Sequence, residues 1–125
     1  MTTPIELKTV VDGEQLMAFL KVNKLPDVLF LDLNMPRKNG FECLTEIRLN
    51  TTLDDLPIII FSTSFEQEVV NRLYLNGAKY FILKPAEFSQ FKNIIHKTIR
   101  LILEGNIPNP SSENFVLTLQ SPLFK

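Results

Sequence analysis

The chain has 125 residues, of which 45% are hydrophobic and 22% charged, and its formal net charge is −1. This length fits one domain, and the near-neutral charge argues against a nucleic-acid binder, which usually carries a basic excess on one face. With a single cysteine, no secretory signal and no membrane-length apolar run, the sequence predicts a cytoplasmic protein that binds no membrane.

The first half of the chain alternates strand-like apolar runs with helical stripes. Residues 5–11 are β-branched and apolar, and we expect a strand there. Asp12 is then placed to cap a helix whose apolar residues follow at helical spacing. Residues 28–31 are apolar on both faces, which is typical of a strand in a parallel sheet. The stripe over residues 41–47 predicts the next helix.

The second half repeats this alternation. We expect strands at residues 58–61 and 80–83, and helices at about residues 66–76 and 87–103. Strict alternation predicts an α/β fold, a doubly wound parallel sheet with helices on both faces. We expect the domain to cover residues 1–105. The tail, residues 106–125, begins as a linker and then offers one short strand-like segment at residues 115–119.

Polar residues follow three consecutive strands of the predicted sheet. Asp32 follows the second strand, Ser62 and Thr63 follow the third, and Lys84 follows the fourth. Taken singly, an aspartate here is more often a turn residue, and a lysine is more often a solvated surface residue. Together at the carboxyl edge of a sheet they suit phosphoryl transfer, in which the carboxylate attacks phosphorus. The ammonium and the hydroxyl would then stabilise the phosphoryl oxygens.

Residues 26–36 and 39–42 resemble the phospho-acceptor segment of receiver domains of two-component response regulators. Residues 57–63 and 77–85 are similar to the next two signatures of that family. The spacings agree, since Asp32 and Ser62 are 30 positions apart and Ser62 and Lys84 are 22 apart. The resemblance implies a flavodoxin-like fold, phosphorylation of Asp32 by a partner histidine kinase, Mg²⁺ as cofactor, and a binding surface that changes for a downstream target.

The resemblance also implies roles for individual residues. Asn34 falls where the family offers a main-chain carbonyl to the metal beside Asp32. Ser62, with Thr63 next to it, falls on the switch hydroxyl, and Phe81 falls on the switch aromatic. Lys84 falls on the phosphate-binding lysine, and the peptide between Lys84 and the following proline is usually cis in the family.

The sequence departs from the family pattern at its start, because the usual first strand and helix are missing. The acidic pair that ends this strand and binds Mg²⁺ is missing with them, and Asp12 and Glu14 are the weak substitutes. We therefore expect weak Mg²⁺ binding and slow phosphorylation. In the family the missing strand lies in the middle of the sheet, between the strands that match residues 5–11 and 28–31. This position could be filled by a shifted first strand, or by residues 115–119 from the same chain or from a partner in a homodimer. An upstream segment absent from this sequence is the third option.

Two other functions remain open. A pseudo-receiver of the same fold would bind partners without taking phosphate, and the missing acidic pair favours it. An α/β hydrolase with an aspartate nucleophile would need a second aspartate two residues after Asp32, where this chain has Asn34. Beyond accepting its own phosphoryl group, the protein is not expected to be an enzyme.

Overall fold

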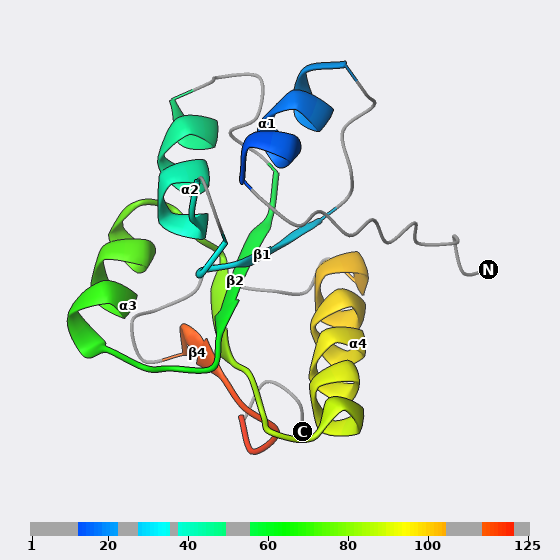
Figure 1. Ribbon diagram of the computed structural model, residues 1–125. Coiled ribbons are helices and arrows are strands. Elements are labelled where there is room, and N and C mark those ends of the chain that lie inside the picture. Colours follow the sequence, from blue (N-terminus) through cyan, green and yellow to red (C-terminus); the bar gives the residue numbers. More distant parts are fainter. Residues whose placement is uncertain (1–12, 23–27, 36–37, 50–55, 105–113, 122–125) are drawn as a thin grey trace.

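The computed structural model describes residues 13–22, 28–35, 38–49, 56–104 and 114–121. Within them the helices and strands alternate in the order expected from the sequence (Figure 1). Their bounds are α1 Gly13–Val22, β1 Leu29–Asp32, α2 Gly40–Arg48, β2 Ile58–Ser62, α3 Gln67–Leu75, β3 Tyr80–Leu83, α4 Phe88–Glu104 and β4 Val116–Leu117.

The four strands form one parallel sheet in the order β1-β2-β3-β4. The inner strand β2 has the clearest strand pattern in the sequence, an unbroken apolar run in which Ile58, Ile59 and Ile60 are all fully buried. A strand with helices on both faces has no solvent side, so its apolar residues run on without alternation. The strands expected at residues 28–31, 58–61 and 80–83 are confirmed, whereas residues 5–11 lie outside the described residues.

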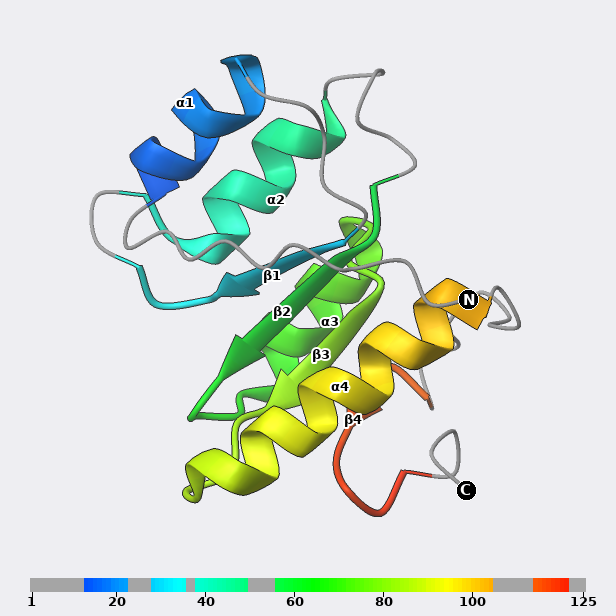
Figure 2. The ribbon, with the colours of Figure 1, turned by 90° about the vertical axis from the view of Figure 1, so that its right-hand side faces the viewer.

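Helices cover both faces of the sheet, as Figures 1 and 2 show from two directions. On one face α2 and α3 pack against the strands, and α1 lies against α2; Leu44 and Leu73 are among the buried residues of this layer. On the other face α4 packs through Phe91 and Ile94. The doubly wound α/β fold is therefore confirmed. None of the helices in the described ranges is long and apolar enough to cross a membrane.

The last strand, β4, extends the sheet beyond β3. Phe115 is buried, its carbonyl accepts a hydrogen bond from the Phe81 amide at 3.0 Å, and its ring meets Tyr74 edge-on at 5.3 Å. This segment lies at the edge opposite β1, so the hypothesis that it fills the central position beside β1 within the same chain is wrong. The free edge of β3 and the Tyr74 ring offer it a better site. The shifted first strand, the homodimer and the division at residue 105 stay predictions.

The turn between α3 and β3 holds the amino ends of the strands together. Gly77 has φ +93°, a left-handed conformation that suits glycine and ends α3 as the sequence predicts. Its carbonyl accepts two hydrogen bonds from the Arg48 guanidinium, at 3.1 and 2.9 Å, and the same guanidinium donates to the Leu56 carbonyl at 2.9 Å. Arg48 thereby joins the end of α2 to the chain before β2 and before β3.

The Tyr80 hydroxyl is buried under α4 and finds no hydrogen-bond partner in the part of the chain that the structure describes. Burial raises the pKa of this hydroxyl above its ordinary value of 10.0. The folded protein thus keeps a proton that the unfolded chain releases, so the free energy of unfolding falls as the pH rises above about 10.

Tyr80→Phe is therefore expected to raise the free energy of unfolding by about 1 kcal/mol at neutral pH, because an unpaired buried hydroxyl costs about 1–3 kcal/mol. In this variant the free energy of unfolding should also decrease less as the pH rises above about 10. Urea unfolding across this pH range measures both effects. Tyr74→Phe is the control, which removes the hydroxyl of a half-buried tyrosine and leaves its ring against Phe115. A Tyr80→Phe protein less stable than the wild type would contradict the prediction.

Candidate functional site

The carboxyl ends of β1, β2 and β3 meet at one edge of the sheet. Asp32 ends β1, Ser62 ends β2, and Lys84 directly follows β3. Main-chain hydrogen bonds continue the ladder past the strands: the Leu33 amide donates to the Phe61 carbonyl at 2.9 Å, and the Lys84 amide donates to the Ser62 carbonyl at 2.8 Å. The structure therefore places the three residues that the sequence predicts, Asp32, Ser62 and Lys84, at neighbouring strand ends on one edge of the sheet.

Asp32 and Lys84 belong to the face of the sheet that α4 covers. Asp32 is paired with Phe61, and Phe61 with Ile82, so these three side chains point to the same side. Ile82 and Phe61 both pack in the core beneath α4. Lys84 lies two residues beyond Ile82 and so emerges on this side as well.

Ser62 and Phe81 belong to the opposite face, under α2 and α3. Ser62 is paired with Leu83, and Phe81 lies two residues before Leu83 on the same strand. Both Ser62 and Phe81 are almost fully buried. The predicted switch hydroxyl and switch aromatic thus share one face, and the acidic and basic side chains share the other.

Asn34 connects the two faces at the edge of the sheet. Its main-chain amide donates to Asp32 Oδ1 at 3.0 Å, and its side-chain Nδ2 donates to Ser62 Oγ at 3.2 Å. Ser64, which the sequence analysis missed, gives Ser62 Oγ a second donor through its amide at 3.2 Å and a hydroxyl contact at 3.3 Å. The run of three hydroxyl residues at positions 62–64 is the sequence feature that could have indicated Ser64. The Ser62 hydroxyl is therefore held in place from two sides.

The remaining predicted residues lie further from this network. Thr63 is exposed, and no hydrogen bond of the described residues joins it to Asp32, Ser62 or Lys84. Glu14 is exposed in the first turn of α1, and Asp12 lies outside the described residues. No group of three acidic, histidine or cysteine residues that could hold a metal occurs in the described ranges. Asp32 and the Asn34 carbonyl still fit Mg²⁺, which commonly takes one or two carboxylates together with phosphate oxygens.

Lys84 lies over aromatic rings rather than beside the Asp32 carboxylate. Its ammonium is 5.1 Å from the centre of the Phe91 ring and 5.9 Å from that of Phe61. No ion pair between Lys84 and Asp32, both of which the structure describes, is formed. The expectation of a cis peptide after Lys84 is wrong: no peptide bond of the described residues is cis, and X–Pro bonds favour trans by about 0.5–1 kcal/mol.

A cavity of about 320 Å³ opens beside this site on the α2 and α3 face. Phe81 lies at its base with 1% of its surface exposed, and the ring meets the Phe65 ring edge-on at 6.3 Å. The Phe81 ring is therefore buried on the same face of the sheet as the Ser62 hydroxyl. The cavity is lined among others by Leu33, Asn34, Phe41, Ser64, Val70 and Phe81.

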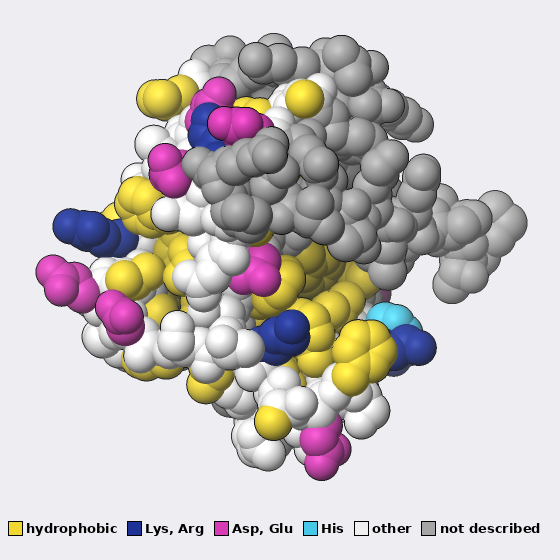
Figure 3. Space-filling view, viewed as in Figure 1, with side chains coloured by type: hydrophobic (Ala, Val, Ile, Leu, Met, Phe, Trp, Pro, Cys, Tyr) yellow, Lys and Arg dark blue, Asp and Glu magenta, His cyan; other side chains and the backbone are white. Residues whose placement is uncertain are grey.

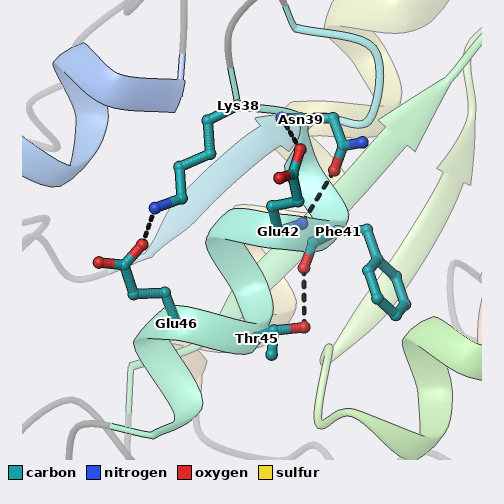
Figure 4. A network of polar contacts seen from close by, with 6 residues as sticks. All are labelled: Lys38, Asn39, Phe41, Glu42, Thr45 and Glu46. Atoms are coloured by element: carbon teal, nitrogen blue, oxygen red, sulfur yellow. Dashed lines mark hydrogen bonds and ion pairs between the residues drawn. The ribbon is translucent and has the colours of Figure 1, made fainter.

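The first turn of α2 is fixed by its own side chains, which Figure 4 shows together. Asn39 and Glu42 form a reciprocal capping box, with Asn39 Oδ1 accepting from the Glu42 amide at 2.8 Å and Glu42 Oε1 accepting from the Asn39 amide at 3.1 Å. An ion pair joins Lys38 to Glu46 on one side of the helix, and the Phe41 ring points to the other side (Figure 4).

Gly40, the first residue of α2, lies directly on the end of β1. Its amide donates to the Leu33 carbonyl at 3.0 Å. A Cβ atom here would lie 2.7 Å from the Asp32 carbonyl oxygen and 2.9 Å from Leu33 Cα. Only glycine lets the helix approach the Asp32 main chain this closely.

Comparison with known proteins identifies the family of this fold. Residues 2–96 match the family model of the response regulator receiver domain. A phosphorylated cyanobacterial phytochrome response regulator, RcpA, has a similar structure with a TM-score of 0.79 and 33% identity, covering 89% of this chain and 83% of RcpA. The Mn²⁺-bound form of response regulator Rcp1 has a TM-score of 0.71 and 26% identity, over 88% of this chain and 84% of Rcp1.

The chain spans only part of the length of the curated relatives that follow. The protein-glutamate methylesterase/protein-glutamine glutaminase of Clostridium acetobutylicum is 38% identical over 116 residues, which cover 87% of this chain and 32% of that protein. The chain also covers 59% of the probable methanogenesis regulatory protein FilR2 of Methanothrix harundinacea, at 26% identity. The family match, the parallel sheet and the arrangement of strand ends lead to one conclusion: this chain belongs to the response regulator receiver domain family.

Proposed function

We propose that this receiver domain accepts a phosphoryl group on Asp32 from a partner histidine kinase and passes the change to a downstream protein. The observation that carries the proposal is the meeting of Asp32, Ser62 and Lys84 at one sheet edge. The phosphorylated state of the similar RcpA structure supports it.

The hydrogen bonds at the site indicate which atom reacts. Asp32 Oδ1 accepts from the Asn34 amide, and Oδ2 accepts none of the described hydrogen bonds. Oδ2 is therefore the free nucleophile, which attacks phosphorus as the bond from phosphorus to the donor's oxygen or nitrogen breaks and the donor leaves with that electron pair. The product is an acyl phosphate on Asp32.

Ser62 and Lys84 then stabilise the phosphoryl oxygens. The Ser62 hydroxyl exchanges its Ser64 contact for a phosphoryl oxygen and donates to it. The Lys84 ammonium neutralises charge on the same group. The Asp32 carboxylate and the Asn34 main-chain carbonyl would hold Mg²⁺, which would supply further positive charge to the phosphoryl oxygens. With one described carboxylate at the site, weak metal binding and slow phosphorylation are expected.

Incubation with acetyl phosphate and Mg²⁺ tests the proposal. The intact mass should increase by one phosphoryl group, and hydroxylamine, which cleaves acyl phosphates, should reverse the increase. Omitting Mg²⁺ should slow labelling, because the phosphoryl charge is then left to Lys84. A protein that gains no phosphoryl mass at saturating donor and metal would contradict the proposal.

A second candidate function is phosphate-independent binding of partners by a pseudo-receiver. The observation that favours it is the position of the Lys84 ammonium over Phe61 and Phe91, away from the Asp32 carboxylate. Absence of labelling in the same mass experiment would favour this function.

A further inference from the structure

The nearest described partners of the Lys84 ammonium are two aromatic rings, and it forms no ion pair with Asp32. Phe91 projects from α4 and is 7% exposed, and its ring packs on that of Phe61 with centroids 5.1 Å apart at an angle of 54°. The ammonium lies within about 6 Å of both ring centres, the range in which a cation is attracted to an aromatic face.

We propose that Phe61 and Phe91 form a holding site for the Lys84 ammonium, and that phosphorylation of Asp32 draws the ammonium off these rings. The exchange makes Phe91 a positioning residue that reports the state of Asp32 to α4. This inference rests on the proposed function, since it requires a phosphoryl group on Asp32.

Strand register makes the exchange short. Phe61 is the direct strand neighbour of Asp32, and both side chains point to the face covered by α4. The Lys84 main chain is anchored to Ser62 by a 2.8 Å hydrogen bond, so only the flexible side chain has to move. A lysine stem reaching over Phe61 is thus already on the correct side of the sheet for the Asp32 carboxylate.

A phosphoryl group outcompetes the rings because it brings about −1.5 to −2 of charge on three acceptor oxygens that project beyond the Asp32 carboxylate. The attraction between an ammonium and a ring face is weak, whereas a phosphoryl oxygen forms a charge-assisted hydrogen bond. The resting carboxylate carries a single negative charge and forms no ion pair with Lys84, although the structure describes both residues, so the ammonium stays on the rings.

Departure of the ammonium changes the contacts of a core residue. Phe91 packs in the cluster beneath α4 with Ile59, Tyr80 and Leu117, which belong to β2, β3 and β4. Release of Lys84 removes a cation from the Phe91 ring face and lets that ring adjust. This change takes place on the α4 face, whereas Ser62 and Phe81 lie on the opposite face.

NMR of the lysine side chains tests the resting state. The Lys84 ε-methylene signal, assigned by its loss in Lys84→Arg, should lie upfield of the other lysines because aromatic rings shield nuclei above their faces. Phe91→Leu should move the signal towards the ordinary lysine position, and Phe91→Tyr should keep it upfield. An ordinary Lys84 signal in the wild-type protein would overturn the proposal, whether or not Asp32 is phosphorylated.

Saturation with beryllofluoride and Mg²⁺, a mimic of the acyl phosphate, tests the exchange. The wild-type Lys84 signal should move to the ordinary position. Phe91→Leu should also raise the affinity for beryllofluoride about two- to fivefold, because the competing attraction is reduced. Phe88→Leu, on the same helix with its side chain 76% exposed, is the matched control and should leave the affinity unchanged.

The outcomes separate this inference from the proposed function. Beryllofluoride binding with a Lys84 signal that stays upfield would overturn the exchange and leave phosphorylation of Asp32 intact. Absence of both phosphate labelling and beryllofluoride binding would overturn the proposed function and the exchange, while the resting upfield signal would still support the aromatic holding site. Equal affinities of Phe91→Leu and the wild type, with both proteins folded, would overturn the role of Phe91.

Discussion

Asp32→Asn is expected to abolish the gain of phosphoryl mass from acetyl phosphate. The carboxamide has nearly the same shape, and its oxygen can still accept the hydrogen bond from the Asn34 amide. The nucleophilic carboxylate oxygen is lost, however, so no acyl phosphate forms. Intact mass over a time course measures the effect, and thermal unfolding of the same samples shows whether the fold is kept.

Glu68→Gln is the matched control for this change, because it also replaces a carboxylate by an amide. Glu68 is exposed in the first turn of α3, away from the hydrogen bonds that hold Asp32. Its variant should label at the wild-type rate. Labelling of Asp32→Asn at that same rate would remove Asp32 from the mechanism.

Gly40→Ala is expected to impair both stability and phosphorylation. The added methyl group would meet the main-chain atoms of Asp32 and Leu33 at 2.7 and 2.9 Å, and main-chain atoms cannot rotate away. Overpacking of this kind costs about 1–3 kcal/mol of unfolding free energy. Relief requires α2 to move off β1, which displaces Asp32, and a displacement of about 1 Å can slow a reaction up to about 100-fold.

Gly77→Ala separates the two effects of the Gly40 change. It places a side chain at φ +93°, which costs about 1–2 kcal/mol, but it does so before β3 begins, at the opposite end of the sheet from Asp32. This variant should lose a similar amount of stability in urea unfolding and keep the wild-type labelling rate. Equal labelling by both folded variants would show that the contact between α2 and β1 does not position Asp32.

The fold could be predicted where burial on both faces leaves an unbroken apolar run. Tyr80–Leu83 was predicted at its observed bounds, and the end of α3 at Gly77 followed from the requirement for a left-handed residue. The place of β4 could not be predicted. A two-residue strand carries no register signal of its own, and its position depends on the contact between Phe115 and Tyr74, which only the folded sheet creates.

At the site, the positions along the backbone could be predicted, whereas the position of one side chain could not. Asp32, Ser62 and Lys84 could be predicted because the ends of consecutive parallel strands meet at one edge. The position of the Lys84 ammonium could not, since a flexible four-carbon stem allows many directions and the Phe91 ring comes from a separate helix. Ser64 was missed because its part depends on how the chain turns after β2.

The edge position of β4 has a consequence for the growing polypeptide. Val116 pairs with Phe81, which precedes it by 35 positions, so the far edge of β3 has no partner until that much more chain has been made. At about 5–20 residues per second, translation leaves this edge open for roughly 2–7 s. An unpaired edge is a template for pairing with other chains, so the open edge of β3 offers nascent copies on neighbouring ribosomes a place to associate. Slower elongation through the codons for α4 lengthens this interval and therefore favours aggregation over folding.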